Sequence, residues 1–322
     1  MTGPRGAVLT SDRSAPGGFK PSRAGFVRMM WLFTLLVAAS VPPVARAENA
    51  APPDSLSLLF RASFGTFKDA AAIAVDPLGS VYVVDRGTQT LQKFVGGSLA
   101  LSIGGYGWGD AEFSDPRDVS VPSGLDIFVA DYANHRVQRY DRKLGLVSTL
   151  STWLDTGPDH FGFPLSVTVS PSGELYVIDG ENSRIMKFAP DGTFELSFGG
   201  YDAGAGRLEH PERIRLQSDR LVLVADDDRV LLFDPMGNFV REYGKGFFHR
   251  VRGITASDST VYVLDDSSIT AGDPVQGVMT WRIELRSVPE KVEWETAVDA
   301  AVLGRILYLL TNRRVLMFEV PA

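Results

Sequence analysis

An apolar strand that ends in an acidic residue recurs along this chain, and the repeat constrains the fold more than any other feature. One copy reads Val-Tyr-Val-Val-Asp85 and another reads Leu-Tyr-Val-Ile-Asp179. The copies end 39 to 48 residues apart, at Asp85, Asp131, Asp179, Asp226, Asp265 and, in a weaker form, Thr311. This spacing is typical of one four-stranded propeller blade. We therefore predict an all-β fold, a six-bladed β-propeller of four-stranded antiparallel blades.

The repeat also predicts the order of strands within a blade. An inner strand such as 72–75 comes first and the acid-ended strand second, followed by a third strand with basic and aromatic residues, such as 184–188. A glycine turn then leads to an outer strand. The last copy stops after its third strand, near residue 320, whereas 57–65 reads like an outer strand. We expect this N-terminal strand to complete the last blade and close the ring.

The first 47 residues differ in kind from the repeats. A basic segment up to Arg28 precedes an apolar run at 29–39 and the small-residue site Ala45-Arg46-Ala47. This order is typical of a secretory signal peptide. We predict a signal peptide at 1–47, a linker at 48–55 and the propeller at 56–322, with the protein exported to the periplasm or the extracellular space. The run is short for a membrane span, so no stable span is expected after cleavage; an uncleaved anchor and a start nearer Met29 are the alternatives.

Composition narrows the classes of function. The chain contains no cysteine, so no thiol can act as nucleophile, metal ligand or lipid attachment point. Its formal net charge is −7, and the predicted leader carries six Lys or Arg residues and one Asp, so cleavage would leave a more acidic protein. Such a surface repels polyanions, which argues against nucleic acid as a ligand.

Two stretches, 131–138 and 179–185, carry the pattern Asp-x-x-Asn-x-Arg and resemble the NHL-repeat family, in particular its exported bacterial branch. The resemblance covers about 56–322 and is best in the second and third copies. It implies the propeller fold. It says little about function, because the family includes RNA binders, ubiquitin-ligase targeting modules and lyases.

The repeated trio of the motif is predicted to be structural. An active site is normally built once, whereas a hydrogen-bonded corner that ties strands together recurs in each blade. The residues concerned are Asp131, Asn134 and Arg136 in one copy and Asp179, Asn182 and Arg184 in the next.

Long segments are expected to gather on one face of the ring. We call it the entry face: it carries the loops that lead into the inner strands and the loops between second and third strands. Segments 104–115, 151–163, 199–210 and 266–276 fall there, whereas the opposite face has only tight turns. Since long loops on a rigid scaffold commonly carry binding sites, Trp108, Trp153 and Tyr201 are candidate contacts. We expect Phe113, Phe161 and Phe163 to fill gaps between blades.

The mouth of the central channel provides the other candidates. In the family, the residue after the blade-opening proline, or its equivalent, begins the inner strand near the axis. These positions hold Arg117, Leu165, Glu212 and Arg252, with Arg213 and Arg250 close by. Such charges could bind a small anion or a peptide terminus, or they could neutralise one another and face water.

Enzymatic members of this fold suggest the alternative function. The amidating lyases resemble the chain in blade plan but hold zinc with histidines after the blade-opening proline, where this chain has Arg117, Leu165 and Glu212. Lactonases of the fold bind calcium through inner-strand Asn, Asp and Glu, whereas Asn134 and its equivalents lie in the corner motif. His135, His160, His210 and His249 fall in different blades without close metal-ligand spacing. We therefore predict no catalytic residue, no metal and no cofactor.

The interpretation that follows is an exported, non-catalytic binding or scaffolding propeller. A protein or peptide partner, or a small ligand, is expected at the entry face, at Arg117, Glu212, Arg213, Arg252, Trp108, Trp153 and Tyr201. The alternative is a propeller enzyme, a lyase or a lactonase-like hydrolase, with its site at the channel mouth. The identity of the ligand, the pathway and the oligomeric state do not follow from the sequence.

Overall fold

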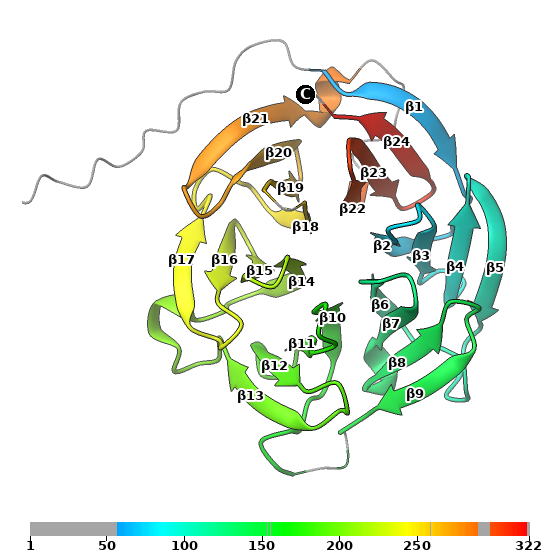
Figure 1. Ribbon diagram of the computed structural model, residues 1–322, viewed down its shortest axis with the longest axis vertical. Coiled ribbons are helices and arrows are strands. Elements are labelled where there is room, and N and C mark those ends of the chain that lie inside the picture. Colours follow the sequence, from blue (N-terminus) through cyan, green and yellow to red (C-terminus); the bar gives the residue numbers. More distant parts are fainter. Residues whose placement is uncertain (1–56, 153, 155, 258, 289–296, 321–322) are drawn as a thin grey trace, which may run out of the picture. The chain divides into compact units, whose positions relative to one another are not determined.

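Six four-stranded antiparallel sheets form a ring around a central channel (Figure 1). This is a computed structural model, and it describes residues 57–152, 154, 156–257, 259–288 and 297–320. The predicted signal peptide and the 48–55 linker lie outside the described residues. No helix in the described part is long and apolar enough to cross a membrane. The predicted fold class is confirmed.

In blades 1 to 5 the strands follow the chain from the axis to the rim (Figure 1). Blade 1 contains β2 (Ala70–Val75), β3 (Val81–Asp85), β4 (Thr90–Val95) and β5 (Ser98–Gly104); blade 2 contains β6 (Pro116–Ser120), β7 (Asp126–Asp131), β8 (Arg136–Asp141) and β9 (Leu146–Leu150). Blade 3 contains β10 (Pro164–Val169), β11 (Leu175–Asp179), β12 (Arg184–Phe188) and β13 (Phe194–Phe198); blade 4 contains β14 (Pro211–Gln217), β15 (Leu221–Asp226), β16 (Arg229–Phe233) and β17 (Phe239–Tyr243). Blade 5 contains β18 (Val251–Ala256), β19 (Val261–Asp265), β20 (Ser268–Asp273) and β21 (Val278–Glu284).

Blade 6 closes the ring with strands from both ends of the described chain. It contains β22 (Ala297–Leu303), β23 (Ile306–Thr311) and β24 (Val315–Glu319), and its outer strand is β1 (Leu59–Phe64). β1 runs antiparallel to β24, with Ser63 opposite Leu316, as predicted. The rings of Phe60 and Phe318 meet edge to face at 5.7 Å, so the closure buries apolar surface as well as a sheet edge.

The core consists of layers between neighbouring blades. Second strands such as β3 and β11 are buried along their whole length because both faces of each blade pack on a neighbour. Their continuous apolar runs reflect this burial. Phe113 and Phe161 are fully buried against Tyr140 and Phe188, at ring distances of 6.1 and 5.9 Å, so their predicted role between blades is confirmed.

Blade 5 departs from the sequence prediction. Residues 266–276 do not form a long entry-face loop, because β20 occupies Ser268–Asp273 and the turn after it lies on the opposite face. The Asp265 Oδ1 atom accepts hydrogen bonds from the backbone N–H groups of Ser267 and Ser268 at 2.8 and 2.7 Å. This short corner replaces the longer motif of blades 2 and 3, and the strand begins immediately after it.

Candidate functional site

The repeated motif forms buried corners on the entry face. In blade 2 the carboxylate of Asp131 accepts hydrogen bonds from the Ser114 N–H, Asn134 Nδ2 and Arg136 Nε, each at 2.8 Å. Burial raises the pKa of Asp131, although these hydrogen bonds oppose the shift. In blade 3, Asp179 accepts from Asn182 Nδ2 and Arg184 Nε at 2.8 and 3.0 Å. The recurrence of this arrangement confirms the structural interpretation.

The blade 2 corner also holds the loop that carries Trp108. Arg136 donates from Nη1 to the Trp108 carbonyl at 2.9 Å and from Nη2 to the Gly109 and Glu112 carbonyls at 3.0 and 2.9 Å. Asn134 donates to the Gly107 carbonyl at 2.8 Å. A structural motif therefore sets the position of a candidate binding loop.

The predicted aromatic contacts lie apart from one another. Trp108 and Tyr201 are 64% and 78% exposed, which leaves their rings available to a partner. Tyr201 packs on the guanidinium of Arg207 at 4.5 Å and lines a wide hollow of about 1080 Å³, which His160 and Phe239 also line. Trp153 lies outside the described residues.

The predicted channel-mouth residues come together in one pocket of about 530 Å³, which we call the arginine cup. Arg86, Arg117, Arg213, Arg250 and Arg252 line it, from blades 1, 2, 4 and 5, together with three acidic residues, Asp69, Glu209 and Glu212. Leu165 lines it from blade 3. Trp108 and Tyr201 do not line the cup, so the candidate residues fall into a central group and a peripheral one.

Ion pairs orient the cup arginines. Arg117 Nη2 lies 2.6 Å from Asp115, and its guanidinium lies 4.5 Å from the Tyr132 ring centre. Arg86 also pairs with Asp115, and Arg252 pairs with Asp266, yet neither carboxylate lines the cup. Arg250 donates to Glu212, and this hydrogen bond raises the pKa of Arg250. More cationic than anionic groups therefore face the cup.

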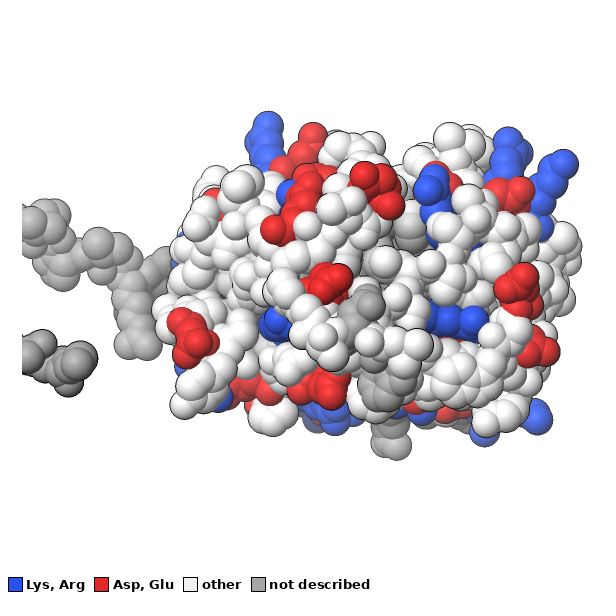
Figure 2. Space-filling view, turned by 90° about the horizontal axis from the view of Figure 1, so that it is seen from below, with Lys and Arg blue, Asp and Glu red and all other residues white. Residues whose placement is uncertain are grey.

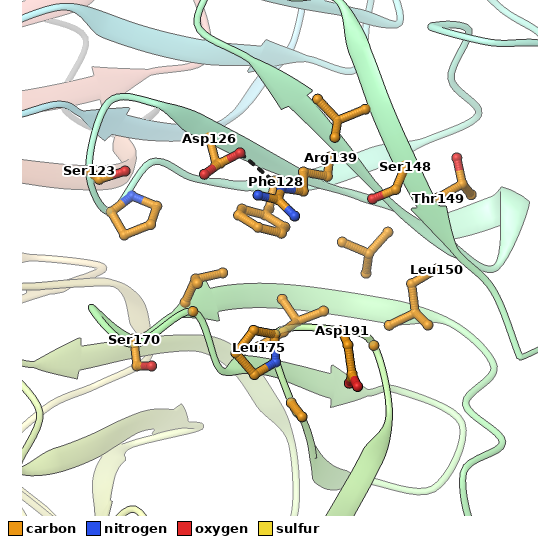
Figure 3. Close-up of a pocket in the computed structure, with 18 of the residues that line it drawn as sticks. Ser123, Asp126, Phe128, Arg139, Ser148, Thr149, Leu150, Ser170, Leu175 and Asp191 are labelled. Atoms are coloured by element: carbon orange, nitrogen blue, oxygen red, sulfur yellow. Dashed lines mark hydrogen bonds and ion pairs between the residues drawn. The ribbon is translucent and has the colours of Figure 1, made fainter.

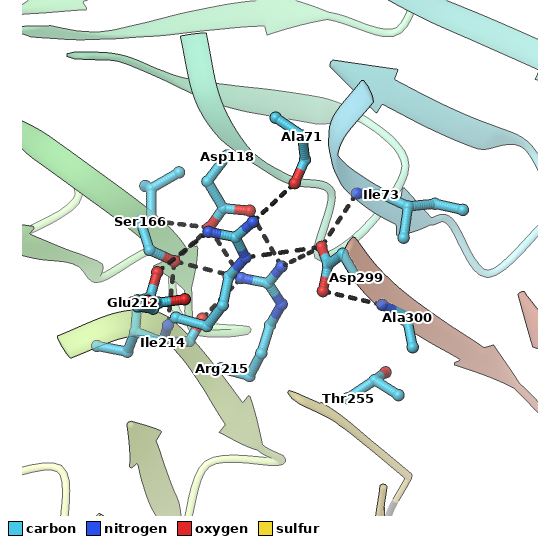
Figure 4. A network of polar contacts seen from close by, with 12 residues as sticks. Ala71, Ile73, Asp118, Ser166, Glu212, Ile214, Arg215, Thr255, Asp299 and Ala300 are labelled. Carbon is cyan, nitrogen blue, oxygen red and sulfur yellow. Dashed lines mark hydrogen bonds and ion pairs between the residues drawn. The ribbon is translucent and has the colours of Figure 1, made fainter. Parts of the chain in front are cut away.

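Two arginines of β14, Arg213 and Arg215, bond to the inner strands of other blades, and Figure 4 shows Arg215 between Asp118 and Asp299. Arg213 Nη2 donates to the Ala71 carbonyl of blade 1 at 2.7 Å. Arg215 reaches Asp118 of blade 2 at 2.8 Å and Asp299 of blade 6 at 3.3 Å. The Ser166 hydroxyl donates to Asp118 and accepts from the Ile214 N–H. We call Asp118, Ser166, Arg213, Arg215 and Asp299 the ionic plug.

The two buried aspartates of the plug have opposite pKa shifts. Burial pushes the pKa of Asp118 up, but the charges of Arg215 and Arg213 outweigh burial and the net pKa is lowered. Burial raises the pKa of Asp299 more than the same arginines lower it. Sequence reasoning missed Asp118, Arg215 and Asp299. The sequence feature that could have revealed them is a charged residue within an inner strand. Such a side chain points toward the axis, where a buried charge needs a partner.

The opposite face contains a groove between blades 2 and 3 that the sequence did not reveal (Figure 3). Its volume is about 590 Å³, and Phe128 and Leu150 of blade 2 lie across it from Leu175 of blade 3. Val137 and Val169 also line it. The tight turns predicted for this face are present, but their spacing between blades leaves the groove open. Ser123 lines it at one of these turns.

Charges elsewhere are mixed. Seen edge-on, the molecule shows Lys and Arg beside Asp and Glu on the rim and toward both flat faces (Figure 2). In the described part of the chain, no three His, Asp or Glu side chains are grouped so that they could hold a metal ion.

Comparisons with known proteins place the chain among propellers. The NHL repeat model matches residues 113–140 and 161–188. The chain is 23% identical over 210 residues to the B-box type zinc finger protein ncl-1 of Caenorhabditis elegans, covering 64% of this chain and 24% of that protein. It is 26% identical over 219 residues to peptidyl-glycine alpha-amidating monooxygenase B of Xenopus laevis, covering 62% and 23%. The chain thus spans about a quarter of the length of these relatives.

Solved structures share the fold. A streptogramin B lyase structure superimposes with a TM-score of 0.57 at 13% identity, covering 83% of this chain and 98% of that one. The structure of U3-55K gives 0.57 at 10% identity, covering 81% and 79%. These likenesses concern the fold alone. This chain is a six-bladed β-propeller that carries NHL repeats.

Proposed function

We propose that this protein is an exported, non-catalytic binding module whose arginine cup takes an acidic group of a protein or peptide partner. The observation that carries the proposal is the convergence of five arginines from four blades on one pocket. Guanidinium groups match carboxylates in a two-pronged geometry, and ion pairs already hold several of them in place. An acidic partner therefore meets donors that need little reorganisation.

The shape of the cup supports binding of a chain end or a protruding side chain. Arg213 and Arg215 bond across the axis to blades 1 and 2, so in this proposal a ligand enters and leaves by the entry face. The exposed rings of Trp108 and Tyr201 lie on loops of that face and supply contact area for the rest of a partner. A small carboxylate fits the same cup as a minimal ligand.

An enzyme at the channel mouth is the alternative, since relatives of this chain include amidating monooxygenases. The inner-strand positions at the mouth favour binding over catalysis. The lyases that this chain resembles have metal-binding histidines there, whereas this chain has Arg117, Leu165, Glu212 and Arg252. Export is part of the proposal and is supported by the leader-like sequence of 1–47.

Affinity capture tests this proposal. The purified protein is immobilised and exposed to the periplasmic or secreted fraction of its source cells, and captured partners are then titrated against variants. We expect Arg117→Ala and Arg252→Ala each to weaken binding by about 1 to 3 kcal/mol without changing the melting temperature. Ser172→Ala, in an exposed turn of the opposite face, is the matched control. Equal affinity of both arginine variants and the control would refute the cup as the binding site.

A further inference from the structure

All six inner strands carry a β-bulge at the same position, and the bulged residues all face the arginine cup. In each inner strand the pairing with the second strand shifts between the first and the third residue, which leaves the second residue without a partner in the ladder. A bulge re-aims the side chain of the extra residue. The six extra residues line the cup, and they are Ala71, Arg117, Leu165, Glu212, Arg252 and Val298.

Bulged residues of the same chemical kind lie opposite each other across the cup. The inner strands of blades 2 and 5, β6 and β18, lie on opposite sides of the axis, and so do β10 and β22 of blades 3 and 6 (Figure 1). The first pair of strands carries Arg117 and Arg252. The second pair carries Leu165 and Val298, which are both half-buried. The cup therefore has two opposed cationic groups, with apolar surface between them on either side.

The two opposed arginines are held in place and keep N–H groups for a ligand. Arg117 bonds to Asp115 through Nε and Nη2, and Arg252 bonds to Asp266 through Nε. Neither carboxylate lines the cup. A guanidinium has five N–H donors. Within the described residues, no hydrogen bond involves Nη1 of Arg117 or either Nη atom of Arg252. Each guanidinium can therefore donate to a carboxylate that enters the cup.

The other charged groups of the cup already have partners. Three acidic side chains line it, and their basic partners complete the pairs Glu212–Arg250, Asp69–Arg86 and Glu209–Arg229. Arg213 donates to the backbone carbonyl groups of Ala71 and Glu212. These contacts lie within the wall of the cup. Arg117 and Arg252 are thus the arginines best placed to bind an anion from outside.

We propose that the arginine cup recognises a dicarboxylate, with one carboxylate at Arg117, the other at Arg252, and the carbon chain between them against Leu165 and Val298. This specificity rests on the function proposed for the cup and names the acid that the cup takes. A monocarboxylate satisfies only one of the two arginines. Two sources offer the same chemistry: a free aliphatic diacid, and a peptide that ends in aspartate or glutamate, whose last residue carries its α-carboxylate and a side-chain carboxylate.

Isothermal titration calorimetry of the purified protein tests the proposal. Succinate, glutarate and adipate are compared with butyrate, valerate and hexanoate, the monocarboxylates with the same numbers of carbon atoms. We expect the best diacid to bind at least about tenfold more tightly than its matched monoacid. In Arg117→Ala and in Arg252→Ala this ratio should fall to about one to two, because one carboxylate then has no partner. Arg220→Ala, which removes an exposed arginine, is the control and should keep the native ratio.

Three N-acetylated tripeptides, each with two alanines before the last residue, distinguish the two sources. One ends in glutamate with a free C-terminus, one in glutamate with an amidated C-terminus, and one in glutamine with a free C-terminus. Only the first carries two carboxylates. If it binds at least about tenfold more tightly than the other two, the source is a peptide end. If only the free diacids are preferred, the source is a small diacid. Both results support recognition of a dicarboxylate.

Equal affinity of diacids and monoacids for the native protein would overturn the proposal, as would a preference for diacids that both arginine variants keep. A failure of every diacid and of the glutamate peptide to bind would overturn it too. If all acids bound and all lost affinity equally in the arginine variants, the cup would still take acidic groups and only the dicarboxylate specificity would be wrong. If no affinity depended on Arg117 or Arg252, the function proposed for the cup would fail as well.

Discussion

The two ends of the channel are built from the same repeated blade, yet they differ in chemistry. The entry end is the arginine cup, whose charged side chains lie at the start of the inner strands. The opposite end adjoins the groove, which apolar side chains line together with the Arg139–Asp126 pair of one blade and the carboxylate of Asp191. The difference teaches that a repeat fixes where side chains are presented, while single residues at equivalent positions decide what each end can bind.

Breaking the ionic plug should have the largest effect, because its two carboxylates are fully buried. Arg215→Met leaves Asp118 and Asp299 buried without their main cation. We expect a loss of about 3 to 5 kcal/mol in the free energy of unfolding. Urea denaturation measures it, and Arg220→Met, at an exposed position, is the control. A stability within error of the control would mean that Arg215 does not stabilise the two buried carboxylates.

Loosening the blade 2 corner should affect the entry end alone. Asp131→Ala removes the acceptor shared by the Ser114 N–H, Asn134 and Arg136, and we expect a loss of about 2 to 3 kcal/mol. Amide hydrogen exchange should rise in 105–112 and stay unchanged in the turns that line the groove. Asp110→Ala, at an exposed position in the loop, is the control. Exchange that rises equally at both ends would show that they are not independent.

The smallest expected effect is a pH dependence at the entry face. A hydrogen bond with the Thr152 carbonyl and contacts with Glu181 raise the pKa of His160. Because the folded pKa is raised, the stabilisation is complete below the unfolded pKa of about 6.5 and is lost as pH rises through the folded pKa. The amide exchange rate in 157–163 of the native protein should therefore rise with pH more steeply than the intrinsic exchange rate of an unfolded chain. An identical pH profile in His160→Asn would contradict this.

The sequence predicted the ring, its closure and the residues of the cup because each depends on a regular register. Arg117, Glu212 and Arg252 recur at one position of the blade, so their convergence follows from the fold. The ionic plug depends on long side chains that cross the axis, and no single repeat shows which partner Arg215 reaches. Blade 5 was misread because its short corner at Asp265 does not follow the motif.

The groove was harder to predict because a gap between blades depends on how two sheets are spaced. Phe128 and Leu175, which line it, look like ordinary core residues of buried strands in the sequence.

A titration tests the central claim, that the arginine cup binds the partner and the opposite face does not. The captured acidic partner is titrated against the native protein, the Arg117→Ala/Arg252→Ala double variant and Ser172→Ala. We predict that the partner loses affinity only for the double variant. If the double variant bound the partner as tightly as the native protein does, or if Ser172→Ala weakened binding as much as the double variant, the claim would be wrong.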